Sequence, residues 1–200
     1  MQASANIELT PEELLEEALK YKNFIAKGGV TATGGEPLVQ AEFLTEFFRL
    51  CKRENLHTAL DTSGAIFNEK TKEALQYTDL VLLDIKSIQP EVHKRLTGVK
   101  LKNTLQFLDY LEKKQIPTWI RHVIVPDYTD NDEQLTKLAK YLKQYTTIKK
   151  IELLPYHTMG IKKYEQLNLN YSLKDTKPLS EERFSQTKEL FQRELPDLFK

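Results

Sequence analysis

Short apolar runs alternate along this chain with longer stretches whose apolar residues recur at helical spacing. The runs LVLLDIK and TWIRHVIV are almost continuously hydrophobic, which is typical of parallel strands with both faces covered. Between them lie amphipathic segments, such as residues 39–53, where Phe43, Phe47, Leu50 and Cys51 fall on one helical face. The pattern predicts a parallel α/β architecture with right-handed crossovers.

Capping signals place several helix starts. Thr10 and Glu13 form a capping box with proline between them, which predicts a helix through about residue 26 with Phe24 available for burial. Asp130 and Glu133 predict a second capping box before another helix. A last helix is expected from Ser180.

Five strands are predicted, and no Gly/Ser-rich linker or low-complexity segment divides them. They lie in VTATGG, HTALDTSG, LVLLDIKS, TWIRHVIVP and IKKIELLPYH. Residues 1–200 are therefore expected to form one domain.

Composition narrows the possible partners and compartments. The 29 Lys plus Arg balance 29 Asp plus Glu, so no net charge attracts the chain to nucleic acid or to an anionic membrane. The first residues are polar and acidic, and no apolar run reaches membrane-spanning length, so we expect a cytoplasmic protein. The single cysteine, Cys51, excludes an intramolecular disulfide and is expected to be an inert core thiol.

Polar residues gather where the predicted strands end, which is the functional end of parallel α/β folds. They are Gly34, Gly35, Glu36, Asp61, Asp84, Lys86, Arg121 and His157. Because side chains alternate along a strand, Asp84 and Lys86 should share a face while Leu83 and Ile85 point into the helical layer.

Two carboxylates in this set call for a cation. Sequential parallel strands lie about 4.8 Å apart, so Asp61 and Asp84 could come close together in a partly dry site. Lys86, Arg121, a metal ion or a ligand ammonium could supply the positive charge. This mixture of charges suits a zwitterionic ligand resembling an amino acid.

Each of these residues also has an ordinary structural explanation. A Gly-Gly turn before a helix is common, Asp61 could cap the next helix, and His157 could be a surface residue. Their joint occurrence at the ends of five consecutive strands favours a site.

The phrases GGVTATGGEPLVQAEFL, HTALDTSG, LVLLDIK, WIRHVIVPDYTDND and IELLPYHTMGIKKYEQLNLNYSLKDTKP together resemble the pyruvate formate-lyase activating enzymes. The resemblance implies a partial (β/α)6 barrel of parallel strands. It further implies binding of S-adenosylmethionine, its reductive cleavage with a [4Fe-4S] cluster, and a 5′-deoxyadenosyl radical that takes hydrogen from a glycine of the lyase. The implied partners are pyruvate formate-lyase and a flavodoxin- or ferredoxin-type reductant.

The resemblance also assigns roles to individual residues. Gly34, Gly35 and Glu36 would receive the methionine amino group through their backbone. Asp84, Ile85 and Lys86 would border the cofactor, with Arg121 near it and His157 at its adenosyl end. Asp61 and Asp84 match the two carboxylates that hold a monovalent cation against the cofactor carboxylate.

One departure from the family pattern is large. The CxxxCxxC loop, which supplies three thiolates to the cluster, and the strand before it have no counterpart in this sequence. We therefore expect an N-terminally truncated chain that is inactive alone. The alternatives are a catalytically silent module that binds S-adenosylmethionine or docks on the lyase, and a metal- or phosphate-dependent barrel enzyme. The long segment from Met159 to Ser180 is expected to help dock the lyase.

Overall fold

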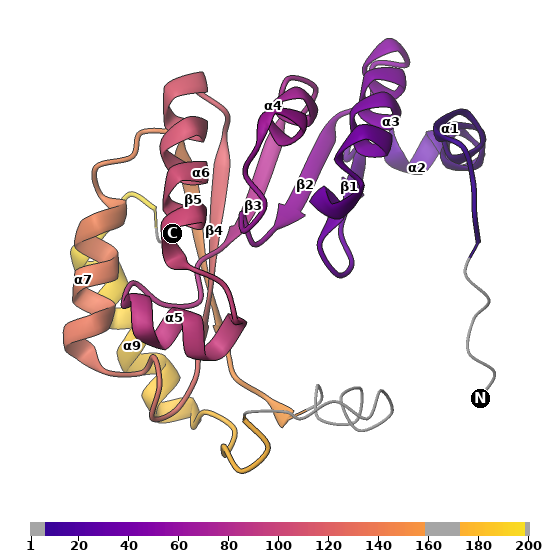
Figure 1. Cartoon of the computed structure of the whole chain (residues 1–200). Coiled ribbons are helices and arrows are strands. Elements are labelled where there is room, and N and C mark those ends of the chain that lie inside the picture. The colour runs from indigo at the N-terminus through magenta and orange to yellow at the C-terminus, as the bar shows by residue number, and fades with distance from the viewer. Residues whose placement is uncertain (1–6, 159–172, 199–200) are drawn as a thin grey trace. The chain divides into compact units, whose positions relative to one another are not determined.

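The computed structural model describes residues 7–158 and 173–198 (Figure 1). Its helices are α1 (Pro11–Leu19), α2 (Lys22–Ile25), α3 (Ala41–Arg53), α4 (Glu69–Leu75), α5 (Pro90–Thr97), α6 (Leu101–Lys114), α7 (Asp132–Leu142) and α9 (Glu181–Glu194), with a 3-10 helix η1 (Pro37–Gln40). Its strands are β1 (Val30–Ala32), β2 (Thr58–Thr62), β3 (Leu80–Asp84), β4 (Thr118–Ile124) and β5 (Ile148–Pro155).

The strands follow one another in the sheet in sequence order, β1-β2-β3-β4-β5. β1 pairs with β2 in parallel, with Val30 opposite Thr58, and β4 pairs with β5 in parallel, with Arg121 opposite Glu152. This arrangement confirms the predicted parallel α/β architecture. The chain divides into two compact units: unit 1 runs to Thr62 and includes Ile66–Val81, and unit 2 comprises Ser63–Ala65 and the chain from Leu82 on.

In unit 1, α3 packs against α1, α4 and β2. Its buried face carries Phe47, Phe48 and Cys51, and Phe48 and Cys51 are fully inaccessible. The helical spacing predicted the burial of Phe47 and Cys51, but Phe43 and Leu50 are only partly buried and Phe48 was missed. Apolar burial on this face supplies the main driving force for the unit.

The first helix differs from the prediction. The capping box is present, with Glu13 N donating to Thr10 Oγ1 and Thr10 N donating to the Glu13 carboxylate. The helix, however, ends at Leu19, and α2 is a separate turn. Because the break ends the helical register, Phe24 does not continue the apolar face of α1 and is 85% exposed, so its predicted burial was wrong.

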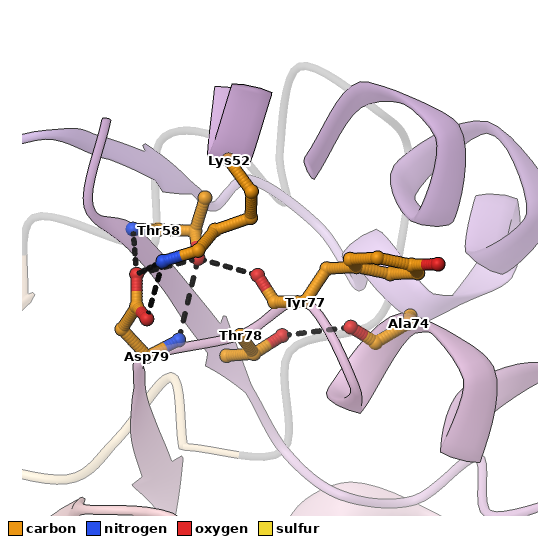
Figure 2. A network of polar contacts seen from close by, with 6 residues as sticks. All are labelled: Lys52, Thr58, Ala74, Tyr77, Thr78 and Asp79. Atoms are coloured by element: carbon orange, nitrogen blue, oxygen red, sulfur yellow. Dashed lines mark hydrogen bonds and ion pairs between the residues drawn. The ribbon is translucent and has the colours of Figure 1, made fainter. Parts of the chain in front are cut away.

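A polar network in unit 1 lies at the N-terminal ends of β2 and β3 (Figure 2). Lys52 Nζ, at the end of α3, lies 2.6 and 2.7 Å from the two Asp79 carboxylate oxygens. Thr58 N donates to Asp79 Oδ2 at 2.8 Å, and Thr78 Oγ1 donates to Ala74 O at 3.0 Å. The network therefore connects α3, α4 and the N-terminal ends of β2 and β3. The candidate site residues lie at the opposite, C-terminal ends of these strands.

In unit 2, α7 packs against α9, and α5 packs against α6. Figure 1 shows α7 and α9 side by side, in orange and yellow. The fully buried side chains of this unit include Phe107, Leu108, Ile120, Ile124 and Phe191.

The start of α7 corrects a second prediction. Asn131 is the N-cap, and its Oδ1 accepts from Glu133 N at 2.9 Å and Gln134 N at 3.3 Å. Asp130 instead accepts from Asp127 N at 3.0 Å, so it closes the preceding turn. The predicted Asp130–Glu133 capping box was therefore wrong by one residue, because Asn131 competes for the same donors.

Among the residues described, no helix is both long and apolar enough to cross a membrane.

Candidate functional site

The loop after β1 presents glycine backbone to open space. Gly34 has φ +137°, a backbone conformation that residues other than glycine rarely adopt. A Cβ built on Gly34 or Gly35 would meet no atom within 4 Å. A ligand could therefore approach the backbone of both residues closely.

Glu36 organises this loop within unit 1. Its carboxylate Oε1 accepts from Leu38 N at 3.2 Å, which caps η1, and from Thr62 Oγ1 at 2.7 Å, which reaches the end of β2. The Glu36 side chain thus links the ends of two neighbouring strands.

Asp61 lies at the end of β2, also in unit 1. Its Oδ2 accepts a hydrogen bond from Thr33 Oγ1 at 3.1 Å. The residue that caps α4 is Asn68, whose side chain accepts from Thr71 N, so the alternative that Asp61 is simply a helix cap was wrong.

In unit 2 a row of alternating charges crosses one face of the sheet. Lys86 Nζ lies 2.8 Å from Asp84 Oδ2, and Arg121 Nε lies 4.0 Å from Asp84 Oδ1. Arg121 Nε also lies 3.7 Å from Glu152 Oε2, and Lys150 Nζ lies 3.0 Å from Glu152 Oε1. The predicted residues Asp84, Lys86 and Arg121 are therefore brought together.

Asp84 retains capacity for a ligand. Within the described part of the chain its Oδ1 atom is buried and accepts no hydrogen bond. A buried acceptor without a donor is costly unless a cation or a ligand donor completes it. The Arg121 guanidinium, with its Nε 4.0 Å away, supplies positive charge near this atom but is too distant to donate a hydrogen bond to it.

Glu152 and Lys150 were missed by the sequence reasoning. Their signal was the alternation of polar and apolar residues in KIEL, residues 150–153, but only the β4–β5 register shows that Glu152 lies opposite Arg121. Lys150 lies opposite Trp119, with its Nζ 4.7 Å from the ring centroid.

His122 was also missed, because it lies within an apolar strand run. Its side chain is 2% exposed, and its Nδ1 lies 2.6 Å from Ile85 O. Burial lowers the pKa of this imidazole to about 4, although the Ile85 carbonyl opposes the shift. His122 is therefore neutral at neutral pH, with Nδ1–H donating to the carbonyl.

The residues after β5 are only partly described. His157 is exposed and follows Tyr156, whose hydroxyl donates to Leu173 O at 3.2 Å. Residues 159–172, which carry most of the predicted lyase-docking segment, lie outside the described residues.

Asp61 belongs to unit 1 and Asp84 to unit 2, and their pairing around a cation stays a prediction.

The single cysteine is placed in the interior. Cys51 is fully buried in α3, and burial raises its thiol pKa to about 11. Within residues 7–158 and 173–198 no group of three or more His, Cys, Asp or Glu side chains could hold a metal ion.

Comparisons with known proteins agree with this arrangement. Residues 2–139 match the model of the radical SAM superfamily. The chain is 46% identical over 178 residues to the pyruvate formate-lyase-activating enzyme of Clostridium pasteurianum, covering 88% of this chain and 74% of that protein. It is 40% identical over 190 residues to the pyruvate formate-lyase 1-activating enzyme of Escherichia coli K12, covering 93% and 77%.

Solved structures give the same picture of the fold. A domain of the pyruvate-formate lyase-activating enzyme from Bacteroides vulgatus superposes with TM-score 0.69 at 26% identity, covering 84% of this chain and 94% of that one. SuiB of Streptococcus suis superposes with TM-score 0.67 at 18% identity, covering 97% and 42%, which supports the fold alone.

The parallel sheet thus matches the partial barrel of the radical SAM fold. This superfamily consists of enzymes that use S-adenosylmethionine together with a [4Fe-4S] cluster. By sequence and by fold, the chain belongs to the pyruvate formate-lyase-activating enzymes of the radical SAM superfamily.

Proposed function

We propose that this chain binds S-adenosylmethionine and serves in the activation of pyruvate formate-lyase by formation of a glycyl radical. The observation that carries the proposal is 40–46% identity, over most of the chain, to relatives named for that activity. When bound, S-adenosylmethionine supplies by one-electron reductive cleavage the 5′-deoxyadenosyl radical that removes a hydrogen atom from a glycine of the lyase. A flavodoxin- or ferredoxin-type reductant in the cytoplasm would supply the electron.

In unit 1, the open backbone at Gly34, Gly35 and Glu36 would receive the methionine amino group. An ammonium group would have room to approach this backbone, because a Cβ built on Gly34 or Gly35 would meet no atom within 4 Å. Asp61, beside Thr33, would supply one carboxylate to a monovalent cation that neutralises the cofactor carboxylate.

In unit 2, Asp84, Ile85 and Lys86 would border the cofactor, Arg121 would lie near it, and His157 would contact its adenosyl end. The buried Asp84 Oδ1 supports a role as the second carboxylate on the cation. The donor set is one of carboxylates, a lysine and a guanidinium, which suits the mixed charges of S-adenosylmethionine.

The cysteine content does not fit the cluster. Iron-sulfur clusters are held by several cysteine thiolates, and this sequence has Cys51 alone, buried and protonated. We therefore propose that the chain by itself does not form the radical. This observation favours the second candidate function, a module that binds S-adenosylmethionine or docks on the lyase.

Calorimetry with S-adenosylmethionine tests the binding proposal. Gly35→Ala introduces a methyl group into space that no protein atom occupies, so folding should be unchanged while affinity falls about tenfold or more. Gly28→Ala is the matched control, because its Cβ would also meet nothing within 4 Å. Absence of binding to the unaltered chain, or equal affinity of both variants, would reject the site.

An anaerobic activation assay tests the catalytic part. The chain, S-adenosylmethionine and reductant are incubated with pyruvate formate-lyase, and the glycyl radical is measured by electron spin resonance. We expect no radical signal above background. A signal proportional to the amount of chain would show that it is active alone.

A further inference from the structure

The chain leaves the sheet after β3 through residues 84–87, here called the exit segment. It carries three of the residues proposed to border the cofactor, namely Asp84, Ile85 and Lys86. The exit segment begins at Asp84, the last residue of β3, and one further backbone hydrogen bond to β4 follows at Ile85.

Both backbone polar groups of Ile85 are bound to β4. Ile85 N donates to Arg121 O at 3.0 Å, and Ile85 O lies 2.6 Å from His122 Nδ1. Because a carbonyl oxygen can only accept, Nδ1 must carry the hydrogen. A side chain therefore holds the chain to β4 at the point where it leaves the strand.

The hydrogen bond between His122 and Ile85 lies on the buried face of the sheet, while the charged residues lie on the other face. His122 is 2% exposed and Ile85 is fully buried, so the hydrogen bond lies on the covered face of unit 2. Asp84 and Lys86, on either side of Ile85, are only partly buried and form their ion pair at 2.8 Å. The orientation of the peptide after Ile85 decides where the Lys86 side chain begins.

We propose that His122 is a positioning residue of the S-adenosylmethionine site: by donating to the Ile85 carbonyl it fixes the orientation of the exit segment, and with it Asp84 and Lys86. Because His122 is buried, this role would act through Ile85 and would need no contact with the ligand. The inference rests on the proposed function, since it assigns a purpose to the fixed segment.

Three variants separate positioning from general stability. His122→Leu fills the space without a donor and leaves the buried Ile85 carbonyl unsatisfied. His122→Asn keeps an N–H at the position of Nδ1. Thr118→Val is the matched control, because Thr118 lies at the other end of β4, is fully buried, and donates to the Ile116 carbonyl at 3.0 Å.

The first measurement is calorimetric affinity for S-adenosylmethionine in the full chain, with thermal unfolding recorded alongside. We expect about tenfold weaker binding for His122→Leu, recovery to within about threefold for His122→Asn, and less than about twofold change for Thr118→Val. Equal affinity of His122→Leu and the unaltered chain would overturn the proposal. Equal losses in His122→Leu and Thr118→Val would also overturn it, since stability alone would then explain them.

The second measurement is hydrogen exchange of peptides covering residues 84–89, without ligand. The proposal requires faster exchange there in His122→Leu than in Thr118→Val, and near-normal exchange in His122→Asn. If the unaltered chain binds no S-adenosylmethionine, the proposed function fails. Exchange that is unchanged in His122→Leu overturns the role of His122 whatever the ligand result.

Discussion

At the scale of single residues, Cys51 has an environment that suppresses thiol chemistry. It is fully buried on α3, and burial raises its pKa to about 11. Only the thiolate reacts with disulfides or binds iron, and at pH 8 about one thiol in a thousand would be ionised.

We therefore predict that Cys51 does not react with a thiol reagent at pH 8 in the folded chain but reacts fully in denaturant. Anaerobic reconstitution with iron and sulfide should likewise give no [4Fe-4S] cluster. The measurements are the absorbance of the released thiol chromophore and the visible spectrum after reconstitution. A stoichiometric cluster spectrum would show that the ligands have been misjudged.

Glu152 gives a second prediction at this scale. Its carboxylate lies between Arg121 and Lys150, so Glu152→Gln removes a charge that helps hold Arg121 beside Asp84. The pairs are partly exposed, so the loss should be modest, about threefold in affinity for S-adenosylmethionine.

Glu133→Gln serves as the control for Glu152→Gln. It removes the negative charge of another unit 2 ion pair, with Lys137, on the exposed surface of α7. The affinity of the Glu133→Gln variant for S-adenosylmethionine should equal that of the unaltered chain. Equal effects of the two substitutions would indicate a general charge effect and no specific hold on Arg121.

At the scale of elements, Glu112 joins the end of α6 to the turn before β5. Its two carboxylate oxygens accept from the backbone N–H and hydroxyl groups of both Thr146 and Thr147, at 2.7 to 3.1 Å. Burial alone would raise the pKa of Glu112, but these hydrogen bonds outweigh it and lower the pKa to about 2.

A lowered pKa makes this contact a source of pH-dependent stability. The stabilisation is fully present above the unfolded pKa of about 4.3 and is lost as pH falls toward 2. Glu112→Gln should lower the free energy of unfolding by about 1–2 kcal/mol at pH 7, allowing for solvent screening. Urea unfolding at pH 7 and pH 3 measures this, and the difference between the two proteins should shrink at pH 3.

The start of β1 depends on a glycine. Gly29 has φ +75°, and a Cβ at this position would lie 2.0 Å from the His57 carbonyl oxygen, which accepts from Val30 N. Gly29→Ala should therefore displace β1 from β2 and lower the free energy of unfolding by more than about 2 kcal/mol. Gly28→Ala, which meets no neighbour, should change it little, and comparable unfolding midpoints for both would contradict this account.

At the scale of the whole molecule, charge balance is the leading property. Lys plus Arg equal Asp plus Glu, and the sequence pI is about 6.9. The exposed apolar side chains of the described residues include Ile7, Tyr21, Phe24 and Val39. Near pH 7 little repulsion opposes contact between copies through such residues.

We predict that solubility is lowest near pH 7 and rises at pH 9. Phe24→Ser should raise solubility at pH 7 without lowering the unfolding temperature, because Phe24 is 85% exposed. Static light scattering against protein concentration measures the effect of pH and the effect of the substitution on solubility. A lower unfolding temperature for Phe24→Ser would show that this side chain packs against the folded protein.

The sequence by itself determined the features that depend on near neighbours. Alternation of apolar runs and helical spacing indicated the five strands and the buried face bearing Cys51, because periodicity is set by the geometry of each element. The Thr10–Glu13 capping box was readable because donor and acceptor lie three residues apart. The proximity of Asp84 and Lys86 followed from their alternation at the end of β3, whereas Arg121 was expected at a strand end and lies in the middle of β4.

The tertiary structure decided the contacts between residues distant in sequence. The β4–β5 register set Glu152 opposite Arg121, the end of β3 brought Ile85 O to His122, and packing of α6 gave Glu112 its two threonines. A hydrogen bond or ion pair forms only when both partners reach the right distance and direction, and a pattern along the chain does not contain that information. The cap of α7 is a local contact, but two adjacent residues could form it, and the backbone geometry decided for Asn131 over Asp130.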